Sequence, residues 1–441
     1  MQTPVDLAQQ LTRWGFGQAL PSLVFTSRAR NGDLQGQVVK RTTRSQDLPL
    51  DLFDQIRAAG PFAVEKIAHT TARLDVVREV LASPDVAVGQ FTPDQSPFVR
   101  AASWAARSAP VGPITPPSLL AVEPPDHTRM RKLVTRVFTV RAVERLRGRT
   151  EQIAGELLDE MERRRRAGQP VDLIESYAAP LPVTVICEIL GVPQRHQADV
   201  LRFGNLAAPS LDFGLPLRRF RQVEGALREF EQWLTEHIER LRREPGDDLF
   251  SQLVAARDDD GQPLTDVELR STAGLVLAAG FETTVNLIGN ATALLDQHRE
   301  QREALLAGDA QWSVAVDEAL RHDPPVLLTA RTTIRDTEIA GVPIRRNRPI
   351  VTLLAAANRD PEVFTDPDRF DVHRDNAADH ISFSSGRHYC LGAALARMEG
   401  DVALRALRER YPGLRVDHER ARRRNTRILR GYAALPVVLE P

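Results

Sequence analysis

The sequence predicts a mainly α-helical protein with small β-sheets, arranged around one long helix. Helical periodicity dominates residues 140–243, and a second long helix is predicted to begin after Pro263. β-type alternation is found in short segments, chiefly at residues 331–344, 349–354 and 435–439. No Gly/Ser-rich, repeated or low-complexity segment divides the chain, which favours one large domain.

The composition excludes several classes of protein. The 441 residues carry a net charge of −1, with 42% hydrophobic and 27% charged residues, so the chain can bury a large core. The lack of a global positive charge argues against nucleic acid or an anionic membrane as a partner. Without a signal peptide or a run of about 20 apolar residues, we expect a cytoplasmic protein with no transmembrane segment.

Residues 1–45 are predicted to be a loosely packed extension, because their mildly apolar part is interrupted by Gly15, Gly17 and Pro21. The single domain is then expected to span residues 46–441.

The domain is expected to begin with a helix near Leu50, a short strand near Ala63 and a helix capped by Thr71. Proline and small residues then dominate residues 85–125, which predicts a functional loop or lid.

Two basic side chains share one face of the helix expected after Pro125. His127 and Arg131 are four residues apart and therefore lie on the same side. Such cationic groups could hold a pair of carboxylates; ordinary surface charge is the alternative.

A capping box marks the start of the long helix. Thr265 can cap it while Glu268 bonds back, and a helix of about thirty residues would be ~45 Å long. Residues 275–281 are apolar on all sides, so the middle of this helix should be buried.

Polar residues follow directly in this buried stretch, namely Glu282, Thr283 and Thr284. Burial of these polar side chains destabilises the protein unless they form hydrogen bonds or serve a function. Gly280 and the threonine hydroxyls predict a local distortion of the helix that opens a polar niche. A proton-delivery site is one interpretation, and satisfied buried groups without a role are the other.

The most distinctive stretch runs from Phe383 to Gly392 and contains Cys390, one of two cysteines. A helix is expected just after it, so its N–H groups should stabilise the thiolate and lower the thiol pKa. Such a thiolate can ligate a metal; an inert buried cysteine is the alternative. Cys187 lies in an apolar run and is expected in the core, so no disulfide is predicted.

The stretch from Phe383 to Gly392 resembles the haem-binding loop of the cytochrome P450 superfamily, whose Phe, Gly, His or Arg, Cys and Gly recur here at the same spacing. The His127, Glu282 and Glu318 segments match further family motifs in the expected order. The resemblance is to soluble bacterial, actinobacterial-like haem-thiolate monooxygenases. It implies the cytochrome P450 fold, a single triangular haem domain with a long central helix.

The resemblance also implies roles for individual residues, with haem b as cofactor. Cys390 would be the axial thiolate ligand of the haem iron, and Glu282 and Thr283 would relay protons. The residues implied to bind haem or leave room for O2 are His127, Arg131, Ala279, Gly280, Arg331, Phe383, Gly386, His388 and Gly392. The implied structural triad is Glu318, Arg321 and Arg369.

The implied reaction is insertion of one oxygen atom from O2 into a C–H bond or alkene of an apolar small molecule. Because no dinucleotide or phosphate-loop motif is present, electrons are expected from a ferredoxin and an NAD(P)H-dependent ferredoxin reductase. Arg129, Lys132 and Arg136 are expected to present positive charge for docking of the ferredoxin. The protein is expected to be a monomer.

Three other interpretations stay open from the sequence. A peroxide-driven peroxygenase is one, although such members carry Arg–Pro where this chain has Glu282 and Thr283. A non-catalytic haem-based small-molecule binding protein is the second. The third is a zinc site, for which the candidate ligands are His373, His380, His388 and Cys390.

Overall fold

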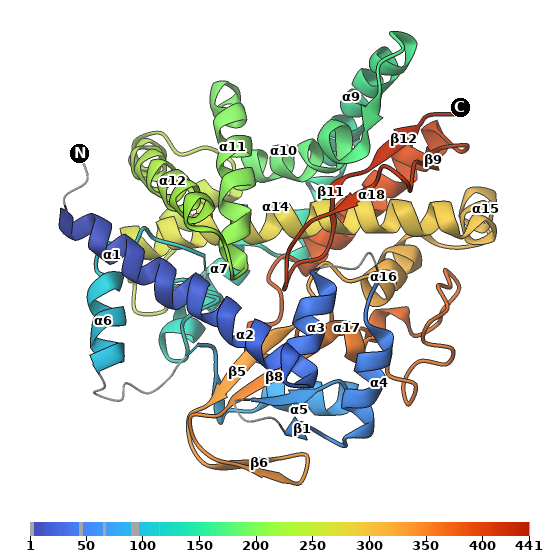
Figure 1. The fold of residues 1–441 in the computed structure, drawn as a ribbon. Coiled ribbons are helices and arrows are strands. Elements are labelled where there is room, and N and C mark those ends of the chain that lie inside the picture. Colours follow the sequence, from blue (N-terminus) through green and yellow to red (C-terminus); the bar gives the residue numbers. More distant parts are fainter. Residues whose placement is uncertain (1–3, 44–46, 65–67, 90–96, 114, 441) are drawn as a thin grey trace.

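The structure is a computed structural model that describes residues 4–43, 47–64, 68–89, 97–113 and 115–440. It is mainly helical with small sheets, as predicted (Figure 1). The α-helices are α1 Pro4–Trp14, α2 Leu20–Arg30, α3 Leu34–Thr42, α4 Leu50–Ala58, α5 Leu74–Ala82, α6 Pro97–Ala106, α7 Asp126–Val137, α8 Val140–Glu144, α9 Arg147–Arg166, α10 Pro180–Ile189, α11 Gln197–Ala207, α12 Leu217–Arg243, α13 Leu249–Ala255, α14 Asp266–Gln297, α15 Arg299–Ala307, α16 Trp312–His322, α17 Leu354–Ala357 and α18 Ala393–Arg410.

The strands are short and far apart in the sequence. They are β1 Ala63–Val64, β2 His69–Thr71, β3 Val86–Ala87, β4 Val171–Asp172, β5 Thr329–Thr333, β6 Thr337–Ile339, β7 Val342–Ile344, β8 Pro349–Thr352, β9 Arg415–Val416, β10 Arg422–Arg423, β11 Tyr432–Ala434 and β12 Pro436–Val438. The largest sheet has the order β1-β2-β8-β5-β3, in which only β2 and β8 run parallel. Three smaller sheets pair β4-β12-β9, β10-β11 and β6-β7.

Helix α14 is the centre of the fold and crosses the whole molecule in Figure 1. Both halves of the predicted capping box are present, with Thr265 accepting from the Glu268 N–H and Glu268 accepting from the Thr265 N–H. Helices α10, α12, α16 and α18 pack against it. Among the described residues, α14 alone is long and apolar enough to cross a membrane, but 67% of its apolar window is buried inside the protein, as expected for a core helix.

The N-terminal segment differs from the prediction of a loosely packed extension. Residues 4–30 form α1, a π-helical turn at Gly15–Ala19 and α2, and α1 packs on α6 and α12 (Figure 1). The reason is a set of long-range polar contacts, including a buried ion pair between Arg13 and Glu224 at 2.6 Å. Sequence reasoning missed them because the partner lies 211 residues away.

The predicted cap of α5 is also wrong. Thr71 lies in β2, and the first helical N–H, that of Leu74, donates to the Asp360 carboxylate at 2.8 Å from 286 residues away. The predicted loop at residues 85–125 contains α6, while its residues 90–96 and 114 lie outside the described part of the chain.

Candidate active site

Cys390 lies between a 3₁₀ turn at Gly386–His388 and the start of α18. Its backbone N–H donates to the Phe383 carbonyl at 2.9 Å, which closes the loop. Gly392 is the N-cap residue of α18, and its backbone N–H bonds to the Cys390 sulfur. The loop therefore presents the thiol beside a helix N-terminus, as the sequence predicts.

Two residues of this loop have left-handed backbone conformations. Gly386 has φ +65°, and a Cβ there would lie 2.3 Å from the Leu81 carbonyl oxygen at the end of α5, so only glycine fits. Ser384 has φ 63° although it is not glycine. Because a side chain strains this conformation, glycine would be favoured at this position.

The pKa of the Cys390 thiol differs in direction from the prediction. Burial raises this pKa, and it outweighs the Gly392 N–H and the positive charges of Arg131 and Arg397, which lower it. The helix N-terminus therefore does not by itself lower the pKa of this thiol. Cys187 lies in the core as predicted, where burial raises its thiol pKa to about 12.

The basic residues near this loop surround one carboxylate that sequence reasoning missed. Glu123 accepts from the Arg387 guanidinium at 3.0 Å and contacts His388 Nε2 at 3.2 Å. The His388 ring lies 4.5 Å from the ring of His127 on α7. Burial raises the pKa of Glu123, but the bond to His388 and the nearby cations produce a net lowering.

This cluster holds more buried positive charge than Glu123 can balance. Arg331, only 5% exposed, donates to Thr329 Oγ1 and the Ala330 carbonyl, and it forms no ion pair within the described residues. Burial lowers its pKa to about 10 and lowers that of His127 to about 4. His127 Nε2 is buried without a hydrogen-bond partner in the described structure.

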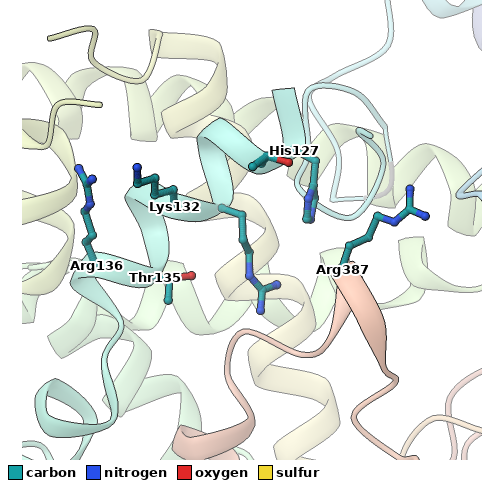
Figure 2. Close-up of a pocket in the computed structure, with 7 residues that line it drawn as sticks. His127, Lys132, Thr135, Arg136 and Arg387 are labelled. Carbon is teal, nitrogen blue, oxygen red and sulfur yellow. The ribbon is translucent and has the colours of Figure 1, made fainter. Parts of the chain in front are cut away.

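A hollow of about 550 Å³ opens between α7 and the Cys390 loop (Figure 2). In the figure, His127 and Arg387 lie at one end, and Lys132 and Arg136 lie further along α7. The lining residues, none of them acidic, are His127, Thr128, Arg131, Lys132, Thr135, Arg136 and Arg387. The site therefore suits an anionic ligand.

One face of α14 is left open in the middle of the buried helix. Ala279, Gly280 and Thr283 are partly accessible, as are Leu275 and Val276 one turn earlier, whereas the flanking residues are buried. This i, i+4, i+8 repeat defines a single face with room for a flat group.

The helix is not distorted at this point. Residues 266–297 are α-helical throughout, so the predicted local distortion is wrong. The Thr283 hydroxyl donates to the Ala279 carbonyl at 2.6 Å and Thr284 to the Gly280 carbonyl at 2.9 Å. Both hydroxyls find acceptors without breaking the helical ladder.

Glu282 is 2% exposed and is held by a residue from the C-terminal hairpin. Its Oε1 lies 2.8 Å from Nε of Arg424, which sits between β10 and β11. Its Oε2 has no partner among the described residues. Burial raises the pKa of Glu282, with Arg424 acting in the opposite direction.

A second buried acid, Glu399 on α18, was not singled out from the sequence. It is 2% exposed, and burial raises its pKa to about 8, against a hydrogen bond from Thr284. A neutral carboxylic acid therefore lies beside the polar stretch of α14 at pH 7.

Glu399→Gln is expected to flatten the pH dependence of stability. The folded protein keeps this proton up to pH about 8, whereas an unfolded glutamate loses it near pH ~4.3. Because the unfolded state binds fewer protons in this window, stability falls as pH rises, by up to about 1.4 kcal/mol per pH unit. Urea unfolding across this window would measure the slope.

The matched control is Glu409→Gln, an exposed glutamate on the same helix. Equal slopes for wild type and Glu399→Gln would contradict the assignment.

The structure brings two members of the predicted triad together and places a different arginine beside them. Glu318 and Arg321 form an ion pair at 2.7 Å with both side chains fully buried. The other guanidinium at Glu318 belongs to Arg374, 3.2 Å away, and not to Arg369. Arg369 is 63% exposed and contributes only its backbone carbonyl, which accepts from Arg321 at 2.9 Å.

The structure also bears on the zinc interpretation and on the basic residues expected to dock the ferredoxin. The described residues contain no cluster of three or more potential metal ligands, so the zinc interpretation has no support. Arg129 pairs with Glu268, and Lys132 and Arg136 both pair with Asp259. The positive charge proposed for docking is thus partly neutralised within the chain.

The fold and the thiol loop define a protein of the haem-thiolate class. A family model described as cytochrome P450 matches residues 313–422. A putative cytochrome P450 140 of Mycobacterium tuberculosis is 47% identical over 416 residues, covering 93% of this chain and 93% of the relative. A 6-deoxyerythronolide B hydroxylase of Saccharopolyspora erythraea is 42% identical over 320 residues, which is 72% of this chain and 77% of the relative.

The crystal structure of P450BioI, solved with an acyl carrier protein, superposes with a TM-score of 0.81 at 29% identity, covering 92% of this chain and 100% of that chain. The chain belongs to the cytochrome P450 superfamily and is a P450 monooxygenase.

The residues present fit the haem group that this family implies. The Arg331 guanidinium has no ion-pair partner and His127 Nε2 has no hydrogen-bond partner among the described residues, so both suit the haem propionates. The Cys390 thiol lies nearby. The uncovered face of α14 offers a surface for one side of a flat ring.

Proposed function

We propose that the protein hydroxylates or epoxidises an apolar organic molecule with O2, using haem b held by Cys390. The observation that carries the proposal is the buried cation of Arg331, which forms no ion pair within the described residues but lies in the same basic cluster as His127 and His388. When bound, haem supplies the iron at which O2 is activated. Phe383, Gly386 and Gly392 shape the loop that positions the thiolate.

The protein's own contribution is the handling of protons. Glu282 and Thr283 lie on consecutive positions of α14, and Ala279 and Gly280 precede them on its open face. Glu282 can hold a proton on its free Oε2 while Arg424 fixes Oε1. The Thr283 hydroxyl, which donates to the Ala279 carbonyl at 2.6 Å, is proposed to pass this proton on.

Electrons are proposed to come from a ferredoxin and an NAD(P)H-dependent ferredoxin reductase. Lys132 and Arg136 are about half exposed and line the basic hollow in Figure 2. An acidic partner would have to exchange with Asp259, their present ion-pair partner. A cytoplasmic monomer fits this arrangement.

The substrate is proposed to be apolar and of medium to large size. The relatives' names include a hydroxylase of 6-deoxyerythronolide B and a 25-hydroxylase of vitamin D(3). The open α14 face, with Leu275, Val276 and Ala279, has the same apolar character.

The decisive test is turnover of a binding compound by the haem-loaded protein with ferredoxin, reductase and NADPH. Lipids, steroids and macrolide-like compounds would first be screened by difference absorption. We expect O2-dependent product carrying one oxygen atom. Product formation with peroxide alone would favour the peroxygenase alternative, and binding without product under either condition would favour a binding protein.

Arg331→Ala is expected to weaken haem retention, because a buried cation that pairs with a propionate is removed. Haem transfer to an excess of apo-globin should accelerate at least about tenfold, which corresponds to the ~1.5–3 kcal/mol of a charged hydrogen bond. Arg335→Ala, a 62% exposed arginine paired with Asp85, is the control and should leave the rate unchanged. Equal transfer rates for both variants would refute the propionate contact.

A further inference from the structure

Helices α1 and α2 with the π turn between them form a rod over residues 4–30, which runs along one side of the molecule (Figure 1). On α1 and the π turn, the side of this N-terminal rod that faces the protein is polar, whereas on α2 the Phe25 ring lies 5.1 Å from that of Phe213. Gln10 and Arg13 both donate to Glu224 on α12, and Gln9 donates to the Trp104 carbonyl of α6. Gln18 accepts from the Leu215 N–H just before α12.

The side that faces away is apolar. Leu7 and Leu11 are each 39% exposed and lie one turn apart on α1, while Leu20 and Leu23 on α2 are 41% and 68% exposed. On α1 this distribution is the reverse of an ordinary surface helix, which buries its apolar face. The leucines of the N-terminal rod therefore point to something outside the chain.

Three arginines at or near the rod have no ion-pair partner among the described residues. Residues 14–27 contain no charged residue, and the described rod carries a single carboxylate, Asp6. Arg30 ends the rod, and Arg218 and Arg221 begin α12 next to Leu215, which contacts Trp14 and Gln18. All three arginines are exposed and form no ion pair with the described residues.

A second copy of the chain is a poorer occupant than a lipid surface. In a two-fold dimer the same surface meets itself, so a surface that carries Arg30, Arg218 and Arg221 would meet an equally basic surface. A bilayer with anionic headgroups instead accepts leucines at the acyl boundary and arginines at the phosphates. The net charge of −1 for the whole chain does not reveal this local excess of positive charge.

We propose that the N-terminal rod docks the protein reversibly on an anionic lipid surface, with Leu7, Leu11 and Leu23 entering the boundary layer. This inference rests on the exposed surface alone and is independent of the reaction proposed above.

The test is flotation of the haem-loaded protein with phosphatidylcholine vesicles, prepared with and without phosphatidylglycerol. Wild type should float with the anionic vesicles, less so at high salt. The triple variant Leu7→Gln, Leu11→Gln, Leu23→Gln should lower the bound fraction at least about tenfold, because three apolar side chains no longer leave water. Arg30→Glu with Arg218→Glu should abolish the preference for phosphatidylglycerol.

The matched control is Leu306→Gln with Val438→Gln, two side chains that are 36% and 54% exposed elsewhere. It should float as wild type does, and all variants should keep the wild-type melting temperature and haem spectrum. The proposal is overturned if wild type stays unbound to anionic vesicles, or if the triple variant floats equally well. It is also overturned if light scattering without vesicles shows a wild-type dimer that the triple variant breaks.

Discussion

Cys390→Ser is expected to abolish turnover and to remove the red-shifted Soret band that we expect from the reduced wild-type protein with carbon monoxide. Serine retains the shape of the side chain, but its oxygen does not supply the thiolate electron donation that favours O–O cleavage. The loop should survive, because its closing bond joins the backbone of Cys390 to the Phe383 carbonyl. The measurements are the carbon monoxide difference spectrum and the rate of product formation.

The control is Cys187→Ala, which removes the other thiol from a fully buried position in the core. This change should cost some stability and leave the spectrum unchanged. A normal carbon monoxide spectrum in well-folded Cys390→Ser protein would contradict Cys390 as the ligand.

Glu318→Ala is expected to cost about 3–5 kcal/mol of folding free energy, because it leaves buried guanidinium groups without their counter-charge. Arg374→Ala should cost about 1.5–3 kcal/mol, since Glu318 keeps Arg321 but loses one charged hydrogen bond. Arg369→Ala should change stability by less than about 0.5 kcal/mol, as its side chain is exposed and its carbonyl remains.

Urea unfolding of the three variants gives this ranking directly. A larger loss for Arg369→Ala than for Arg374→Ala would restore Arg369 as the third member of the triad.

Local sequence signals predicted the elements whose determinants are local. The start of α14 was predictable because both halves of its capping box lie within four residues. The Glu318–Arg321 pair was predictable because helical spacing fixes it. The Cys390 loop was predictable because its glycines and aromatic residue occur within ten positions.

The missed features depend on partners that are distant in sequence. The choice between Arg369 and Arg374 is decided by how the loop after α17 turns, which spacing does not reveal. Glu123 and Arg424 acquire their roles only when the fold brings them to His388 and Glu282. The thiol pKa of Cys390 is raised and not lowered as expected, because it depends on burial by the whole surrounding structure.

The contacts around α5 determine when the molecule can complete its folding during synthesis. The Leu74 N–H is capped by Asp360, Gly386 fits against the Leu81 carbonyl, and the Ser83 carbonyl accepts from Arg387. A nascent chain that ends before these residues leaves α5 without its cap and without its packing partner. The contacts of α5 are therefore complete only when the ribosome has synthesised the chain as far as Arg387, which is nearly nine-tenths of the 441 residues.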